Sequence, residues 1–377
     1  MRELSEQAIR DIAYGSTVLG TGGGGDPYLG TLAAIESARR QGPVRLVDAD
    51  ELADDAVVAF PFIVGAPLPF LEKLTAGPEL GRVLEGFERF LGRKVDAVMS
   101  AEVGGANSTA PMSLAALAGI PVVDGDLIGR AFPELQLCSL TLHGIAASPI
   151  VMGDEHGNAV VVETISNQWG ERLARTTSIC FGAICVAIAY PIDGKAVKAL
   201  TLRGTIGWAE EIGIALRRAH EEKRDGLAAV VEATGGEVLF NGKIIDVDRR
   251  TEQGWVLGEA VLAGADDDAG HELVVHFQNE NLIAVRDGEI VASVPDLITV
   301  LSTETGAAIT TEQLRYGSRV AVLGMACHPI WRTAEGLALA GPSHWHYDHD
   351  YTPLAGRFRP AEIHPWTAPG GSSTVAA

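Results

Sequence analysis

Hydrophobic positions in the first half of the chain follow two different spacings. Apolar residues after Ser5, a good helix cap, recur at helical spacing and predict a helix ending at Gly15 or Gly20. A second helical pattern ends at Gly42-Pro43, and short apolar runs then alternate with helical stretches. The runs cover 44–47, 56–65, 95–105 and 120–126, and the helical stretches cover 79–91 and 111–118. This alternation predicts an N-terminal α/β domain with a mainly parallel sheet covered by helices.

The pattern changes in the second half of the chain. Two amphipathic helical stretches, near 205–222 and 226–233, precede several β-prone runs. Asn241-Gly242 and Asp287-Gly288 lie between such runs, which is the usual signal for a hairpin. The sequence therefore predicts a β-rich α+β C-terminal domain. We expect domains at 1–165 and 166–365 and a flexible tail at 366–377.

Composition and charge indicate which binding partners and which cellular compartment to expect. The chain has 377 residues and a formal net charge of −20, which disfavours both nucleic acid and anionic membrane surfaces. It contains no apolar run of about 18 residues and no signal-like start, so we expect no membrane span. Four cysteines without a CxxC pair fit a reducing cytoplasm. Hydrophobic residues make up 47%, enough for a large core, and a homo-oligomer is among the expected assemblies.

The stretch GTGGGGDPYLG at residues 20–30 raises the main functional question. Its glycines satisfy G-x-G-x-x-G, and Asp48 follows at a distance suited to a ribose-binding acid, so a nucleotide-binding oxidoreductase is one interpretation. However, the preceding segment resembles the end of a helix, and Asp26 would put negative charge beside a pyrophosphate. A purely structural turn is a second interpretation. The third, which we favour, is a loop that presents Asp26 and the backbone N–H groups of Gly22, Gly23, Gly24 and Gly25 to a small ligand.

Two further polar clusters follow apparent strands. In EVGGANSTAP, Glu102 stands at a strand end and Asn107 precedes a helix, where it could simply be a cap. In VVDGDLIGRAFPELQ, Asp124 and Asp126 follow a buried-looking strand, and Arg130 and Glu134 lie four and eight residues after Asp126, offsets that would share one face of a helix. That second cluster could equally be a solvated helix start. Ligands of open α/β sheets bind at the carboxyl ends of strands, which favours the functional interpretation of both clusters.

Two clusters of polar residues lie in the second half of the sequence. His344, His346 and His349 form H-x-H-x-x-H, a spacing that could bind zinc or another divalent metal, or could belong to a solvated loop. The stretch FQNEN at 277–281 interrupts a strand pattern. It predicts either a bulge, or a position for Asn279 or Glu280 at the mouth of a cleft between the domains.

Several of these blocks occur together in a fixed order. The blocks are GTGGGGDPYLG, EVGGANS, DGDLIGRAFPELQ, FQNENLIAVRDG, VPDLI and YGSRVAV. They resemble the family once called domain of unknown function 917 and now named for S-methyl thiohydantoin desulfurase. The resemblance covers about residues 10 to 355 and implies an N-terminal α/β region and a C-terminal region. The closing GPSHWHYDHDY is richer in histidine than the family pattern.

The resemblance also implies an activity. It implies hydrolytic removal of sulfur, as a thiol or hydrogen sulfide, from C2 of a thiohydantoin ring, with a small heterocycle as substrate and hydantoinase- or oxoprolinase-type enzymes as functional associates. An accessory binding protein of such an enzyme is the alternative. The resemblance assigns no residue roles, and no cofactor is certain beyond the possible divalent metal.

The chemistry of that reaction suggests roles for the clustered residues. Adding water to the ring carbon and expelling sulfur needs a base, an acid and a charge stabiliser, which buried carboxylates and backbone N–H groups can supply. The catalytic candidates are Asp26, Glu102, Asp124 and Asp126. The substrate-binding candidates are Gly22, Gly23, Gly24, Gly25, Asn107, Arg130 and Glu134. We expect Asn107 to orient the ring and Arg130 to bind a carboxylate tail.

Overall fold

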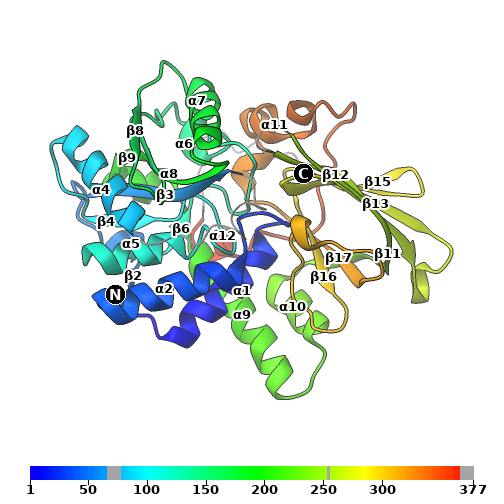
Figure 1. Ribbon diagram of the computed structural model, residues 1–377. Helices are drawn as coiled ribbons and strands as arrows, with labels where there is room; N and C mark the ends of the chain where they lie inside the picture. Colours follow the sequence, from blue (N-terminus) through cyan, green and yellow to red (C-terminus); the bar gives the residue numbers. More distant parts are fainter. Residues whose placement is uncertain (66–77, 253–254, 366–377) are drawn as a thin grey trace.

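The computed structural model describes residues 1–65, 78–252 and 255–365, so the tail predicted at 366–377 lies outside the described residues. The chain folds around two sheets, with helices between and around them (Figure 1). The first sheet has eight strands in the order β1-β2-β5-β4-β3-β9-β7-β8. Their bounds are β1 Arg2–Glu3, β2 Arg45–Val47, β3 Val57–Gly65, β4 Ala97–Met99, β5 Val122–Val123, β7 Ile150–Gly153, β8 Ala159–Val162 and β9 Ile184–Asp193.

The expectation of a mainly parallel first sheet is wrong, because this sheet is mixed. Strands β2, β5, β4 and β3 pair in parallel. Strands β9, β7 and β8 extend the sheet beyond β3 in antiparallel pairs, and β1 pairs antiparallel with β2 at the other edge. A parallel pair needs a crossover of a dozen or more residues. The link between β7 and β8 is far shorter, so these two strands can only run antiparallel.

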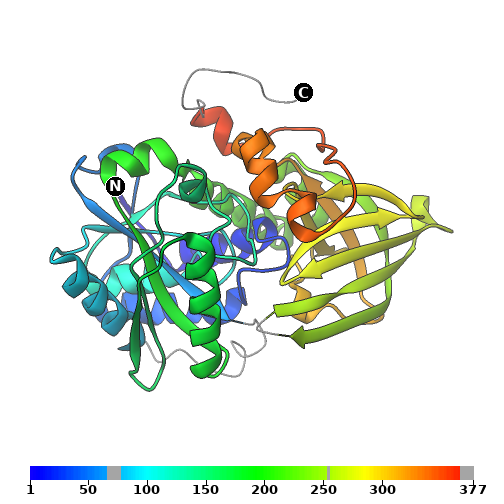
Figure 2. The same cartoon turned by 90° about the horizontal axis from the view of Figure 1, so that it is seen from above.

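The first sheet is covered on both faces. Along β3, Val57 and Ala59 enter one core while Val58 and Phe60 enter the other, as expected for alternating side chains in a strand. Helices α2, α4 and α5 cover the face that carries Val57 and Ala59. Helix α7 lies over the opposite face, which carries Val58 and Phe60 (Figures 1 and 2). The helices of this half are α1 Glu6–Leu19, α2 Pro27–Gln41, α4 Pro78–Leu91, α5 Ala110–Ala118, α6 Ser139–Leu142, α7 Asn167–Cys180 and α8 Gly194–Leu200.

The second sheet has seven strands, all antiparallel, in the order β15-β14-β13-β12-β11-β17-β16. It forms the strongly curved layer on the right of Figure 1. The β-rich character of the second half is therefore confirmed. The bounds are β11 Glu237–Glu252, β12 Trp255–Gly264, β13 Glu272–Gln278, β14 Glu280–Arg286, β15 Glu289–Ser293, β16 Leu297–Ser302 and β17 Arg319–Met325.

One of the two predicted hairpins is confirmed and the other is wrong. Asp287-Gly288 joins β14 to β15. Asn241-Gly242 instead lies inside the long strand β11, which pairs with β12 and β17 on its two sides. A Cβ on Gly242 would come within 2.5 Å of the Ala263 carbonyl oxygen, so the glycine here allows close approach of neighbouring strands.

Helices after residue 200 connect the two halves. α9 Thr205–Glu221 packs along α1, and α10 Gly226–Thr234 lies beside α9 (Figure 1). Because β9 and α9 follow residue 165 but pack with the first sheet and with α1, the chain passes back to the N-terminal half after that position. The division at residue 165 stays a prediction. The remaining short elements are β6 Gly125–Asp126, β10 Leu202–Arg203, α11 Ala334–Ala340 and α12 Pro360–Ile363.

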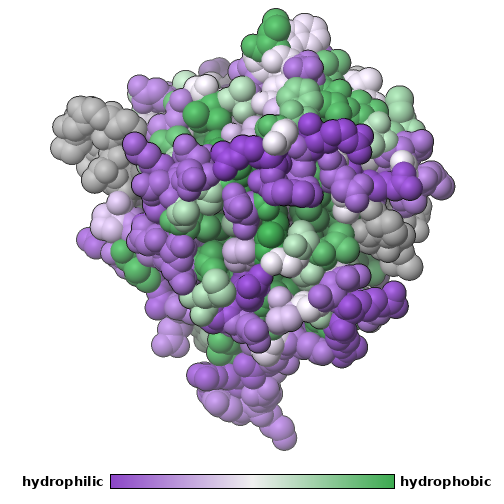
Figure 3. All heavy atoms as spheres, turned by 90° about the vertical axis from the view of Figure 1, so that its left-hand side faces the viewer, coloured by the Kyte–Doolittle hydropathy of each residue, from purple (hydrophilic) through white to green (hydrophobic). Residues whose placement is uncertain are grey.

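On the face shown in Figure 3, hydrophilic residues surround smaller groups of hydrophobic ones. Within the described ranges, no helix combines the length and the apolar character needed to cross a membrane.

Candidate active site

The glycine run forms a bridge between the two halves of the molecule. α1 ends at Leu19, and the turn that follows lies against the second sheet. The carbonyl of Thr21 accepts a hydrogen bond from the Asn281 backbone N–H at 2.7 Å, and the Gly22 carbonyl accepts one from Thr311 N–H at 2.9 Å. The run therefore fixes α1 and α2 to strand β14 and to the loop after β16.

Two of the glycines are required by close packing. A Cβ on Gly23 would lie 1.8 Å from Oε1 of Glu280. Gly24 has a φ of +77°, and its Cβ would lie 2.5 Å from the Cα of Gly104, in the second glycine turn. The two turns are joined because Ala106 N–H and Asn107 N–H both donate to the Gly24 carbonyl, at 2.9 and 3.0 Å. Because Gly23 and Gly24 have no side chains, Glu280 and the EVGGANS loop can both pack directly against this turn.

This geometry does not favour a nucleotide site. A helix, and not a strand, precedes Gly20. The amino end of α2 is already occupied, because Oδ1 of Asp26 accepts from Leu29 N–H at 2.9 Å. Asp48 caps a short 3₁₀ turn and pairs with Arg203, so it is not presented to a ribose.

A pocket of about 860 Å³, a volume that includes its open mouth, lies where the two sheets meet. Residues from the glycine turns, from β3 and β9, from the loop at 127–138, from α7 and from the β13–β14 turn line it. The polar lining residues are Glu102, Asn107, Glu134, Cys138, Glu171, Arg175, Tyr190, Asn279 and Glu280. Of the predicted residues, Gly24, Gly25, Glu102, Asn107 and Glu134 line it.

Glu102 is held in place by two hydrogen bonds. Its Oε1 accepts from the Asn107 side-chain amide at 2.5 Å, and its Oε2 accepts from Phe132 N–H at 3.1 Å. Asn107 is fixed in turn because its Oδ1 accepts from Ile63 N–H at 3.0 Å. Burial raises the pKa of Glu102 to about 7, although these two donors oppose the shift. A carboxyl with such a pKa can exchange a proton near neutral pH.

Glu280 is the second buried carboxyl of the pocket. It begins β14 and rests on Gly23, and its Oε2 has no hydrogen-bond partner among the described residues. Burial, followed by the charge of Glu102, raises the pKa of Glu280 well above its usual range. Two N–H donors favour the ionised form of Glu102, whereas none reaches Oε2 of Glu280, so the contacts favour the negative charge on Glu102 and the proton on Glu280, as a base and an acid need.

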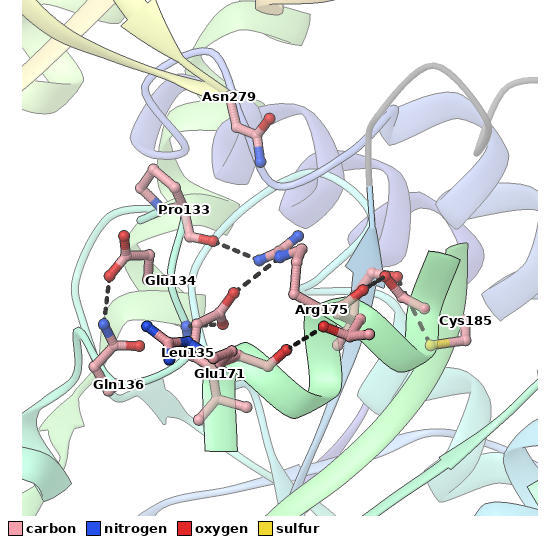
Figure 4. Close-up of polar contacts among 12 residues, drawn as sticks. Pro133, Glu134, Leu135, Gln136, Glu171, Arg175, Cys185 and Asn279 are labelled. Carbon is pink, nitrogen blue, oxygen red and sulfur yellow. Dashed lines mark hydrogen bonds and ion pairs between the residues drawn. The ribbon is translucent and has the colours of Figure 1, made fainter. Parts of the chain in front are cut away.

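The opposite wall of the pocket is built from α7 and the loop at 127–138 (Figure 4). Glu171 accepts from Nε of Arg175 at 2.8 Å and from Leu135 N–H at 2.9 Å. Arg175 also donates to the Pro133 carbonyl at 2.8 Å, and its guanidinium lies 3.9 Å from the centre of the Trp255 ring. These contacts hold the guanidinium in one orientation beside the pocket.

Three of the predicted catalytic carboxylates lie outside the pocket. Asp26 caps α2, and its Oδ2 accepts from the Gln313 side chain at 3.0 Å. Asp124 accepts from Gly207 N–H at 2.9 Å, near the start of α9. Asp126 accepts from three backbone N–H groups, those of Val103, Ile128 and Gly129, at 3.0, 3.0 and 2.7 Å. Burial raises the pKa of Asp126 to about 7, but its contacts serve to fix the loops behind Glu102.

Arg130 and Glu134 do not share a helix face, because residues 127–138 form an irregular loop. Arg130 is fully buried and lies outside the pocket lining. Its guanidinium donates to carbonyls of Ala131, Pro295, Asp296 and Asn281 and to the Thr21 hydroxyl. All five of its N–H groups are thereby used, and none remains for the carboxylate tail that we expected it to bind. Glu134 reaches the pocket edge and pairs with His344 at 3.3 Å.

The three histidines of H-x-H-x-x-H do not converge. His344 contacts Glu134, His346 adopts a left-handed backbone at the end of a 3₁₀ turn, and His349 packs against the Tyr347 ring. In the described part of the chain, no group of three or more His, Cys, Asp or Glu residues is placed to hold a metal ion. The predicted metal site is therefore not supported by the side-chain arrangement.

Four pocket residues were not among the predicted site residues, or were named under only one interpretation. Glu280 and Asn279 appeared only as one of two interpretations of a broken strand. Glu171 and Arg175 are four residues apart on a helix, a spacing that is common on solvated surfaces and gives no sign of a pocket. Their position depends on the pairing of β9 with β3, which brings α7 over the pocket and which has no local signal.

The fold and the site define a two-sheet α/β protein with a carboxylate-containing pocket at the junction of its halves. Family models for the S-Me-THD-like N-terminal domain and C-terminal domain match residues 7–164 and 165–354. The chain belongs to this S-methyl thiohydantoin desulfurase-like family. A crystal structure of a protein from Chromobacterium violaceum is similar in fold, with a TM-score of 0.78 and 21% identity over 94% of this chain and all of that one. No curated protein matches the chain.

Proposed function

We propose that the protein is a hydrolase that removes sulfur, as a thiol or hydrogen sulfide, from a thiohydantoin-type ring. The observation that carries the proposal is the pair of buried carboxyls in one pocket: Glu102, which accepts two hydrogen bonds, and Glu280, whose Oε2 accepts none from the described residues. Membership of the S-methyl thiohydantoin desulfurase-like family supports this choice of ring.

In the reaction that we propose, water adds to the ring carbon that carries sulfur. Ionised Glu102 takes a proton from this water as the carbon–oxygen bond forms, and Asn107 and Phe132 N–H keep the carboxylate oriented. The addition moves the electron pair of the carbon–nitrogen double bond of the S-methyl ring to the ring nitrogen. That pair re-forms the double bond as the carbon–sulfur bond breaks, and protonated Glu280 gives its proton to the departing sulfur. The products are a hydantoin and a thiol, and proton exchange with solvent returns both glutamates to their starting states.

The proposal is tested by turnover of hydantoin, 2-thiohydantoin and S-methyl-thiohydantoin, with ring absorbance and released thiol followed together. We expect thiol release from the sulfur compounds by the isolated chain, without added nucleotide. Binding of these rings without turnover would instead favour an accessory protein of a hydantoinase-type enzyme, which remains the alternative. Association with such an enzyme stays a prediction, as does a homo-oligomer.

The pKa values predict a particular pH dependence. Because Glu102 must be ionised to act as base and its pKa is about 7, we expect kcat/KM to rise as pH increases through about 7. Burial raises the pKa of Glu280 well above its usual range, which favours its protonated form, and we expect the rate to fall where Glu280 loses that proton. The S-methyl substrate is the one to use, since its sulfur carries no proton. A kcat/KM that is constant from about pH 5 to 9 would contradict these roles.

A further inference from the structure

The loop at residues 132–135 carries one of the two donors that hold Glu102. Phe132 N–H donates to Oε2 of Glu102 at 3.1 Å. Residues 132–135 contain no helix or strand, so the backbone groups of this loop must find their partners on neighbouring elements. The position of the Phe132 donor therefore depends on the contacts that hold the loop.

Three backbone groups of the loop are held by side chains from two other elements. Arg175 of α7 donates to the Pro133 carbonyl at 2.8 Å (Figure 4). Glu171, also of α7, accepts from Leu135 N–H at 2.9 Å. On the other side, Tyr190 of β9 donates its hydroxyl to the Leu135 carbonyl at 3.2 Å. The two backbone groups of Leu135 are therefore fixed by different elements, one by α7 and the other by β9.

The backbone of Tyr190 departs from a regular strand. The register of β9 against β3 shifts here, so that Tyr190 and Pro191 lie opposite the single residue Ala59, as in a β-bulge. Tyr190 has a φ of 54°, which is uncommon for a bulky residue, and its N–H donates outside the sheet to the Ala147 carbonyl at 3.1 Å. Bulges next to functional sites redirect side chains, and Tyr190 lines the pocket that holds Glu102.

Neighbouring hydrogen bonds fix the direction of the Tyr190 hydroxyl. Oδ1 of Asn167 accepts from Ala147 N–H at 2.8 Å, and its amide nitrogen donates to Oγ1 of Thr141 at 2.9 Å. That Thr141 oxygen lies 3.4 Å from the Tyr190 oxygen. Because the Leu135 carbonyl can only accept, the Tyr190 hydrogen points at the loop. Burial raises the pKa of Tyr190 well above its usual range, so the hydroxyl keeps this hydrogen.

We propose that Tyr190 is a positioning residue, whose hydroxyl holds the loop at 132–135 so that Phe132 N–H stays on Glu102. Tyr190 acts through the loop and exchanges no proton with the substrate. This inference rests on the proposed function only for the role of Glu102 as base. The link from Tyr190 through the loop to Glu102 belongs to the folded protein, so it can be measured without a substrate.

Tyr190→Phe tests this role. Phenylalanine keeps the ring and its packing but cannot donate to the Leu135 carbonyl, so the loop loses one of its supports. Phe132 N–H favours the ionised form of Glu102, so its displacement should raise the pKa of Glu102 above its value of about 7. Carbon NMR of the chain labelled at its glutamate carboxyls measures this pKa, and the signal missing from Glu102→Gln identifies the residue. We expect the titration midpoint to rise by about 0.5–1 pH unit, and an unchanged midpoint would overturn the proposal.

The charged groups around Glu102 are the same in this variant. The charge of Asp126 raises the pKa of Glu102 and that of Arg130 lowers it, while the charge of Glu102 raises the pKa of Glu280. Because none of these charges is altered by Tyr190→Phe, a shift of the midpoint reports the loss of the loop donor.

Tyr351→Phe is the matched control. It also removes a partly buried tyrosine hydroxyl, one that contacts Sγ of Cys327 at 3.9 Å, and neither of these residues lines the pocket. It should leave the Glu102 midpoint and kcat in place. A shift of equal size in both variants would mean that the midpoint follows the general loss of a hydroxyl, which would contradict the role of Tyr190.

Turnover of S-methyl-thiohydantoin gives a second readout. Tyr190→Phe should lower kcat about 10-fold and leave KM within about two-fold of wild type, because a poorly oriented base slows the chemical step and not binding. The ascending limb of kcat/KM should move to higher pH together with the NMR midpoint. A loss of stability alone would reduce the amount of active protein without moving this limb.

The two readouts separate this inference from the proposed reaction. If the midpoint rises in Tyr190→Phe but no sulfur compound is turned over by the wild-type chain, Tyr190 positions Glu102 and the hydrolase proposal fails. If sulfur compounds are turned over and Tyr190→Phe changes neither the midpoint nor kcat, the hydrolase stands and the positioning role fails. If nothing is turned over and the midpoint does not move, both are wrong.

Discussion

Replacing Glu102 by glutamine should lower kcat for S-methyl-thiohydantoin by about 100- to 10,000-fold, the range that removal of a general base commonly produces. Glutamine fills the same space and keeps one of the two hydrogen bonds that hold Glu102, so the fold should be retained. It cannot take a proton from water. The ascending limb of the pH profile near 7 should disappear together with the activity.

A matched control separates this effect from the general cost of altering a buried acid. Glu312 is also buried, and burial raises its pKa, but it does not line the pocket. Glu312→Gln should therefore leave kcat within a few-fold of wild type. If both variants lose activity equally while remaining folded by circular dichroism, Glu102 has no special role in the reaction.

Glu280→Gln distinguishes the acid from the base. Loss of the acid should matter less when the departing thiol is itself more acidic, because such a thiolate leaves without a proton. We therefore expect the defect of Glu280→Gln to shrink when S-methyl is replaced by a nitrophenylthio group, whereas the defect of Glu102→Gln should persist. Equal responses of the two variants to the leaving group would mean that the roles of acid and base are not divided in this way.

Local patterns accounted for most of the elements but not for their arrangement. Helix α1 with its Ser5 cap and helix α2 up to Gly42 follow directly from apolar spacing and capping residues. The position of β9 beside β3 does not, because a strand that is apolar throughout can pair in either direction. As a result, the first half was expected to contain a mainly parallel sheet, and the wall of the pocket that α7 provides was missed.

Local sequence patterns were equally unable to show which candidate residues line the pocket. Glu102 and Asn107 were found because polar residues after a strand and beside glycines are unusual. Asp26, Asp124 and Asp126 gave the same local signal, yet each accepts hydrogen bonds from backbone N–H groups at a helix start or a loop. Each of these carboxylates lies beside a glycine or after a strand, so the local pattern does not distinguish one that caps backbone N–H groups from one that faces a ligand. Only the tertiary contacts, such as Glu280 resting on Gly23, tell them apart.

Arg130→Met is expected to destabilise the folded protein by about 3–5 kcal/mol, the usual cost of breaking a buried charged network. Arg130 joins the glycine turn at Thr21 to Asn281 of β14 and to the turn at residues 295–296, so its loss leaves several buried carbonyls without donors. Burial lowers the pKa of Arg130 to about 10, which still keeps it charged at neutral pH. Chemical denaturation measures the loss in the free energy of unfolding.

The charge of Arg130 should also be visible in catalysis, although the residue does not line the pocket. It lowers the pKa of Glu102 and of Glu280, in opposition to burial. Removing it should therefore move the ascending limb of kcat/KM above its wild-type position near pH 7. Arg130→Lys keeps the charge but has three donors in place of five, so it should lose stability while the pH profile stays in place. If Arg130→Met is destabilised without a shift in the profile, Arg130 acts through packing alone and its charge does not reach Glu102.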